Sequence, residues 1–188
     1  MTREEFIKVL EDKGYSYKIE GDKIVVTYRG HVYLSSLKTL LPGVVFNTGG
    51  DVYLDSLKTI PHGVEFRNKG DVYLNSLKTL PPGVEFKNGR GVMMRSLKTI
   101  HPGVVFMNKG YVSLDSLKTL TPGVEFNNRG DVYLGSLKTI PLGVEFKNGG
   151  TVDLGSLIGD YFHEWNGSIE GIAPNTLLNG MIKRGIFL

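Results

Sequence analysis

Polar and apolar residues alternate strictly along much of this chain, and the alternation recurs with a period of 20 residues. From Val64 to Ser76, every second residue is apolar or small, and most residues between them are charged or polar. A period of two belongs to extended chain, whose side chains point to opposite sides in turn. The alternation stops at Leu77, and the Pro-Pro-Gly at 81–83 predicts a turn. Each repeat therefore predicts one coil with two short extended segments, "VYL" and "VEF".

The repeats form columns of equivalent residues. Full copies start at Gly30, Gly50, Gly70, Arg90, Gly110 and Gly130, and a seventh starts at Gly150 and fades after Leu157. One column is all valine, and its neighbour is leucine except at Met94. Repeats this short bury their apolar side only by stacking, about 4.8 Å apart when the coils pair as parallel strands. We predict a mainly β, single-domain parallel β-solenoid of about seven coils over residues 30–157.

Polar columns are expected inside the stack as well. An asparagine column, with Thr48 at its first place, is predicted to point inward and bind turn backbone. Its members are Asn68, Asn88, Asn108, Asn128 and Asn148.

The two ends lack the repeat and are predicted to cap the stack. Residues 1–29 predict an α+β cap, in which Thr2 to Glu5 form a helix capping box and a hairpin turns at Gly21-Asp22. Residues 158–188 predict a second cap with one helix opening at Pro174.

Composition excludes several kinds of site. The 188 residues carry a mild net charge of +3 and no cysteine, so disulfides and thiolate metal sites are excluded. The four histidines share no metal-ligand spacing, and no apolar run is long enough to cross a membrane. The N-terminus has no secretory pattern. We expect a cytoplasmic protein without a metal, a cofactor or a membrane partner.

Paired acids are the strongest sign of catalysis, and it is weak. Asp51 and Asp71 would lie about one coil apart, near the ~5 Å carboxylate separation of retaining glycosidases. Every such pair follows from the repeat, and no phosphate-binding glycine motif is present. We predict no enzyme and no catalytic residue.

A lysine column occupies one corner of the predicted coil, at Lys38, Lys58, Lys78, Lys98, Lys118 and Lys138. Lys58, Lys78, Lys98 and Lys118 are candidate residues for binding nucleic acid or another anion. The alternative, which we favour at this point, is a solvated corner that discourages aggregation.

The fourth copy departs most from the pattern. Arg90 replaces an inward glycine, Arg95 replaces a short polar residue, and Met93 and Met107 take positions predicted to face solvent. Exposed apolar residues beside arginine are typical of an interface, although drift under weak constraint gives the same pattern. An outward tyrosine column adjoins them. The candidate protein-binding residues are Tyr53, Tyr73, Met93, Arg95 and Met107, and the side formed by the first four is preferred.

Residues 30–157 resemble the short leucine-rich-like repeats of bacterial and phage proteins, through "LKTIP" or "LKTLP", "GVEF" and an Asn-x-Gly turn. The spacing differs, because Leu57 stands near the usual asparagine position and the next interval is shorter. "VEF" alternates as cleanly as "VYL", which favours a flat β-solenoid over a curved horseshoe. The resemblance implies a protein-binding module, of a kind that phages often encode.

The predicted function is a non-enzymatic intracellular module that binds a host or viral protein. Two alternatives stay open: a structural, self-assembling solenoid, and a binder of nucleic acid or a charged ligand through the lysine column. The oligomeric state stays open too.

Overall fold

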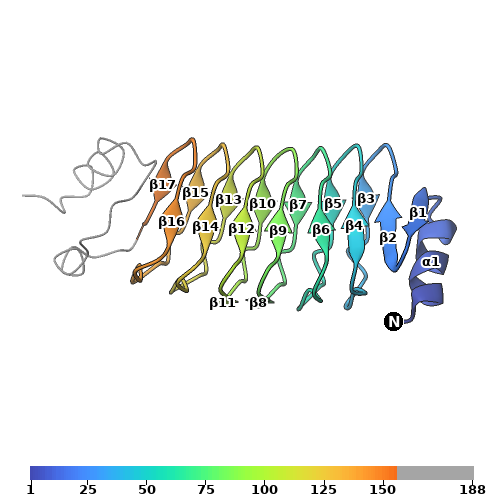
Figure 1. Cartoon of the computed structure of the whole chain (residues 1–188), viewed down its shortest axis with the longest axis horizontal. Coiled ribbons are helices and arrows are strands. Elements are labelled where there is room, and N and C mark those ends of the chain that lie inside the picture. The colour runs from blue at the N-terminus through green and yellow to red at the C-terminus, as the bar shows by residue number, and fades with distance from the viewer. Residues whose placement is uncertain (156–188) are drawn as a thin grey trace, which may run out of the picture.

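The computed structural model describes residues 1–155 as a straight stack of parallel β coils with a helix and hairpin at one end (Figure 1). The helix α1 spans Arg3–Asp12, and the strands β1 (Tyr17–Glu20) and β2 (Lys23–Val26) form an antiparallel hairpin. The predicted β-solenoid is confirmed, with about six turns in the described residues, and its straight form is the flatter of the two forms considered. The expected C-terminal cap over 158–188 lies outside the described residues.

Two long sheets run the length of the stack. The first, here the Phe sheet, has the order β1-β2-β4-β6-β9-β12-β14-β16. Its repeat strands are β4 (Val44–Phe46), β6 (Glu65–Phe66), β9 (Glu85–Phe86), β12 (Val105–Phe106), β14 (Glu125–Phe126) and β16 (Glu145–Phe146).

The second, here the Tyr sheet, has the order β17-β15-β13-β10-β7-β5-β3. Its strands are β3 (Val32–Tyr33), β5 (Val52–Tyr53), β7 (Val72–Tyr73), β10 (Val92–Met93), β13 (Val112–Ser113), β15 (Val132–Tyr133) and β17 (Val152–Asp153). A short third sheet pairs β8 (Thr79–Leu80) with β11 (Thr99–Ile100), and a bridge joins Thr119 to Thr139.

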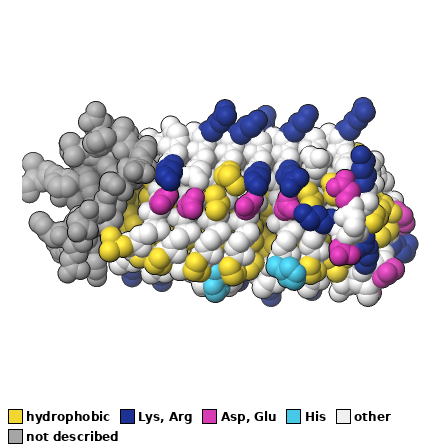
Figure 2. Space-filling view, viewed as in Figure 1, with side chains coloured by type: hydrophobic (Ala, Val, Ile, Leu, Met, Phe, Trp, Pro, Cys, Tyr) yellow, Lys and Arg dark blue, Asp and Glu magenta, His cyan; other side chains and the backbone are white. Residues whose placement is uncertain are grey.

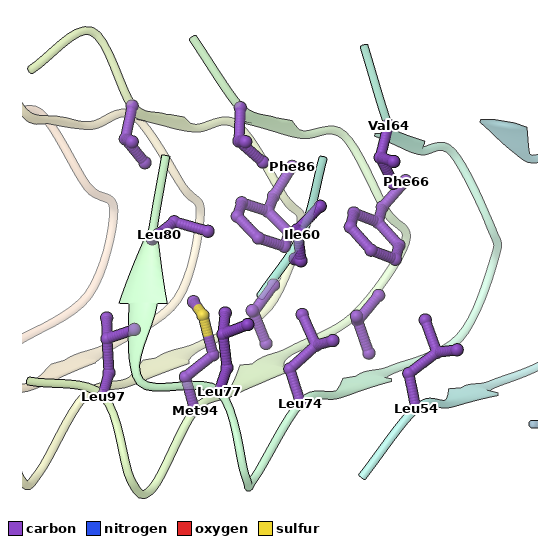
Figure 3. Close-up of a cluster of buried hydrophobic side chains, with 14 of the residues drawn as sticks. Leu54, Ile60, Val64, Phe66, Leu74, Leu77, Leu80, Phe86, Met94 and Leu97 are labelled. Atoms are coloured by element: carbon purple, nitrogen blue, oxygen red, sulfur yellow. The ribbon is translucent and has the colours of Figure 1, made fainter. Parts of the chain in front are cut away.

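The register places every residue beside its equivalent in the next coil. Val92, for example, pairs with Val72 on one side and Val112 on the other. Equivalent core residues therefore stack, and the phenylalanine rings from Phe46 to Phe146 form a ladder with centroids 4.9–5.5 Å apart. Figure 3 shows Phe66 and Phe86 facing the leucines of the Tyr sheet across the core.

The predicted asparagine column is confirmed as buried. The Asn108 Nδ2 donates hydrogen bonds to the carbonyls of Arg90, Gly110 and Tyr111 at 2.9–3.0 Å. One amide thus bonds its own turn and the preceding coil. Asparagine suits this place because a buried carbonyl must find a donor.

Glycine is needed at two positions of each coil: in the tight turn, and where the backbone lies close to the preceding coil. The turn after "LKT" ends in a glycine with φ of 70–82°, a region that favours glycine, at Gly43, Gly63, Gly83, Gly103, Gly123 and Gly143. A Cβ on Gly110 would lie 2.6 Å from the Arg90 carbonyl carbon. This glycine column faces the backbone of the preceding coil rather than the core. The expectation that Arg90 occupies an inward position is therefore wrong, and its side chain is exposed.

The N-terminal segment closes the first coil. The predicted capping box forms, since Thr2 Oγ1 accepts from the Glu5 amide at 3.2 Å and Glu5 Oε2 accepts from the Thr2 amide at 2.7 Å. The strand β2 pairs in parallel with β4, so the hairpin supplies the first rung of the Phe sheet. At the edge of the Tyr sheet, the Tyr33 amide donates to the Tyr15 hydroxyl oxygen at 2.8 Å. These bonds occupy backbone groups that an open edge would leave unpaired.

We expect Asn108→Ala to lower the free energy of unfolding by about 1–2 kcal/mol, because three part-buried carbonyls each lose one of their hydrogen bonds and keep the one from a backbone amide. The Asn108 Oδ1 has no hydrogen-bond partner among the described residues, which keeps the net loss below that of a fully bonded amide. The exposed Lys98→Ala is the control and should change stability by no more than ~0.5 kcal/mol. Urea unfolding measures both, and equal losses would contradict this assignment of inside and outside.

Candidate functional site: the outer face of the Tyr sheet

Stacked tyrosines cover the first half of the outer face of the Tyr sheet. The ring centroids of Tyr33 and Tyr53 are 4.8 Å apart, and those of Tyr53 and Tyr73 are 4.5 Å apart, with interplanar angles of 11° and 6°. Because the rings lie face to face, the face of each inner ring is covered by its neighbour. Ring edges and hydroxyls remain for a partner, and Tyr33, at the end of the stack, is 53% exposed.

The tyrosine column breaks at Met93 and Ser113, and Tyr111 fills the gap from a different position. A Cβ on Gly91 would lie 2.6 Å from the Tyr111 ring, so this ring rests against the backbone of the preceding coil. Burial, and then the charge of Asp71, raise the pKa of Tyr111, and its ring meets Tyr133 edge-on at 6.2 Å. Gly91 and Tyr111 are thus complementary departures from a position that is aspartate in the copies on either side.

The prediction that Met93 faces solvent is wrong. Met93 pairs with Tyr73 and Ser113 on an outward position, as the alternation requires, yet it is only 7% exposed. The Tyr111 ring from the next coil rests on Gly91, two residues before Met93 in the chain. Met93 therefore adds little exposed apolar area to the face.

The remaining predicted contact residues lie in two places. Tyr53, Tyr73 and Arg95 share the outer face of the Tyr sheet, and Arg95 is exposed. Met107 is 37% exposed and follows β12 in the Phe sheet, so the structure does not bring it beside Met93. The preference for the side with Tyr53, Tyr73 and Arg95 thus selects one continuous surface.

An aspartate column ties neighbouring coils of the Tyr sheet together. The Oδ1 atoms of Asp51, Asp71 and Asp131 accept the amides of Asp71, Gly91 and Thr151 in the next coil at 2.6–2.8 Å. The Tyr53 hydroxyl donates to Asp51 Oδ2 at 3.1 Å, and Tyr133 bonds Asp131 in the same way. Carboxylates that sequence analysis considered as a catalytic pair hence already bind backbone and phenol groups. The sequence signal for this role is aspartate recurring directly before "VYL".

The outer positions of the Tyr sheet carry a strong excess of acid. The acids are Asp51, Asp55, Asp71, Asp115, Asp131 and Asp153, whereas Arg95 is the one arginine or lysine at these positions within residues 31–155. The Thr151 amide lowers the pKa of Asp131, which favours its charged form. This face is therefore acidic and aromatic on a protein of net positive charge.

The Phe sheet has the opposite character, because its charges are paired. Glu65 bonds Lys23 at 2.7 Å and also pairs with Arg67, and Glu85 and Glu145 pair with Lys87 and Lys147. Hydrogen bonding from Lys23 lowers the pKa of Glu65. Figure 2, which looks onto the Phe sheet, shows acidic and basic side chains side by side over these strands.

The candidate anion-binding residues Lys58, Lys78, Lys98 and Lys118 are all exposed. They follow the Tyr sheet along one corner of the coil, and within residues 1–155 none of them forms an ion pair.

No known protein family, curated protein or solved structure matches this chain. In the part of the chain that the structure describes, no three His, Cys, Asp or Glu side chains gather to hold a metal ion. No helix there has the length and apolar character needed to span a membrane.

We expect Gly91→Ala to destabilise the protein by about 1–2 kcal/mol, because the new methyl group displaces the Tyr111 ring. In a Tyr111→Ala background the same substitution should cost less than ~0.5 kcal/mol, so a double-mutant cycle should report coupling. Gly135→Ala is the control in the same sheet, since its Cβ would approach nothing closer than 3.4 Å. Additive effects in urea unfolding would mean that the two residues do not form a unit.

Raised tyrosine pKa values predict a loss of stability at alkaline pH. Burial, and then the hydrogen bond to Asp51, raise the pKa of Tyr53, and burial also raises the pKa of Tyr73 and Tyr133. Above the unfolded pKa of about 10, the folded protein keeps protons that the unfolded chain releases. The contribution is therefore complete below pH ~10 and is lost as the pH rises further. Urea unfolding between pH 8 and 11 should show a smaller decline for Tyr53→Phe than for the wild type, and parallel declines would argue against this cause.

Proposed function

We propose that this protein is a non-enzymatic binding module whose acidic tyrosine face binds a lysine- and arginine-rich surface of another protein. The observation that carries the proposal is the combination, on one rigid sheet, of stacked tyrosines and six aspartates against one arginine.

Tyrosine side chains suit a contact surface because they offer large amphipathic area with few rotatable bonds. Here the stacking of Tyr33, Tyr53 and Tyr73 fixes the rings before any partner arrives. Binding then costs less side-chain entropy than it would for free rings. The hydroxyls are protonated at neutral pH, as in any tyrosine, and burial raises the pKa of Tyr53 and that of Tyr73 further.

The charge of the face favours a basic partner. Complementary charge accelerates encounter and disfavours acidic surfaces more than it adds affinity. The aspartates that accept amides of the next coil thus serve both the fold and the acidity of the outer face.

The Gly91–Tyr111 unit makes one position along the face different from the others. A perfectly regular ladder offers the same surface in every coil, so a partner could bind at several positions along it. The Tyr111 ring and the exposed Arg95 mark one place on the face, and they favour one docking position.

We further propose the narrower identity that the resemblance implies. The module would be a leucine-rich-like repeat protein, encoded by a phage and acting in the cytoplasm by occupying a surface of a host or viral protein. The motifs "LKTIP" and "GVEF" support this identity.

A pair of matched variants tests the proposed face. Tyr73→Ala/Asp115→Lys removes one ring and reverses one exposed acid, whereas Glu85→Lys/Met107→Ala makes the same charge change on the Phe sheet. We expect both to fold, and partner capture from lysate of the source cell, followed by affinity measurement, should show at least about tenfold weaker binding for the first alone. The proposal is wrong if the Tyr-sheet variant keeps full affinity, or if both variants lose it equally.

A further inference from the structure

The lysine of "LKT" is an exposed residue that does not vary among the full copies. It occurs in all six full copies, while the outward position of the Tyr sheet changes from Tyr33 to Met93, Ser113 and Asp153. The opposite corner shows that stacking does not require a charge in every coil, since it reads Arg29, Gly49, Lys69, Gly89, Lys109, Arg129 and Gly149.

The fold does not account for this lysine. Its backbone is used, because the Lys98 amide bonds the Lys78 carbonyl at 2.9 Å and Lys138 bonds Lys118 at the same distance. Any residue but proline could make those bonds. The lysine side chains are exposed, and no hydrogen bond or ion pair to them is found within residues 1–155.

The coil register also forces these charges together. Equivalent positions lie about 4.8 Å apart, so the six lysines form a straight row of about 24 Å. Like charges at this spacing repel one another in water, and the repulsion falls with salt. Lys23, Lys87 and Lys147 of the Phe sheet form ion pairs with glutamates. Within residues 1–155 no acid forms an ion pair with the lysine row.

We propose that the lysine row, from Lys38 to Lys138, binds a linear anionic polysaccharide that carries one carboxylate or sulfate on each sugar. An extended sugar chain advances by nearly one coil spacing per ring, so each acidic group meets one or two ammonium groups. The adjoining column Thr39, Thr59, Thr79, Thr99, Thr119 and Thr139 adds hydroxyls that can bond sugar hydroxyls. The site is separate from the acidic tyrosine face.

Nucleic acid fits this row less well. Single-stranded nucleic acid is held by aromatic rings on which bases stack, in addition to basic residues. Neither Lys nor Thr supplies a ring, and in the Tyr sheet the faces of the inner tyrosine rings cover one another. The row therefore offers contacts to charge and hydroxyl but no platform for bases.

Binding to two polymers of similar charge tests the proposal on the full chain. The probes are polygalacturonate and a single-stranded oligonucleotide, with neutral dextran as a blank, and binding is measured by titration calorimetry at several salt concentrations. Lys78→Glu/Lys98→Glu should bind polygalacturonate about tenfold or more weakly, with a shallower dependence on salt. Lys69→Glu/Lys109→Glu carries the same net charge on the opposite corner and should bind nearly as the wild type does.

Three outcomes would overturn the proposal. Absence of binding to polygalacturonate removes the site, and equal losses in the two lysine variants reduce it to an effect of net charge. Tighter binding of the oligonucleotide assigns the row to nucleic acid instead. The Tyr73→Ala/Asp115→Lys variant should keep polygalacturonate binding, so failure of the protein-binding proposal can be told apart from failure of this one.

Discussion

Parallel hydrogen bonding at a register of 20 residues is the constraint from which this structure follows. It places each residue on its own equivalent, so the core must be built from residues that pack well against copies of themselves. Phenylalanine rings in face-to-face contact, leucine on leucine and valine on valine satisfy that condition. The same register leaves each turn with carbonyls that accept a backbone amide, and the asparagine column supplies a further donor to them. No repeat coil precedes the first one, so β2 and the Tyr15 hydroxyl supply the hydrogen-bond partners at that end.

On the outside, the register stacks like charge on like charge, and the protein treats its charged columns in three ways. In the Phe sheet, Glu65, Glu85 and Glu145 pair with basic residues, and Glu125 accepts a hydrogen bond from Asn127 Nδ2. Aspartates of the Tyr sheet bind the amides of the next coil, so their charge contributes to cohesion between coils. The lysine row has neither kind of partner among the described residues. Charge that no residue in 1–155 offsets is what the proposed anionic polysaccharide would neutralise.

Much of the fold could be predicted because equivalent residues in each copy make the same contacts. Alternation separated inside from outside for the core and for Asn108, and proline followed within two residues by glycine located the turn. The errors arose where a side chain depends on another coil. Met93 has an outward position but is buried, and the Tyr111 ring, which lies on Gly91 two residues before it, comes from the next coil. Arg90 was placed inward because alternation cannot distinguish a column that faces the core from one that faces the preceding coil. The amide bonds of the aspartates are likewise contacts between coils.

The departures in the fourth and fifth copies are therefore better understood as one unit than as separate substitutions. Gly91 provides the space that the Tyr111 ring occupies. In the coil that carries Tyr111, the tyrosine column itself has a small residue, Ser113. Independent drift would leave a cavity or a clash at some of these positions, whereas Met93 is enclosed. All coils of a regular ladder present the same surface to a partner. Substitutions that compensate one another keep the stack intact and make one coil different from the rest. Specific recognition by a repetitive surface requires such a place.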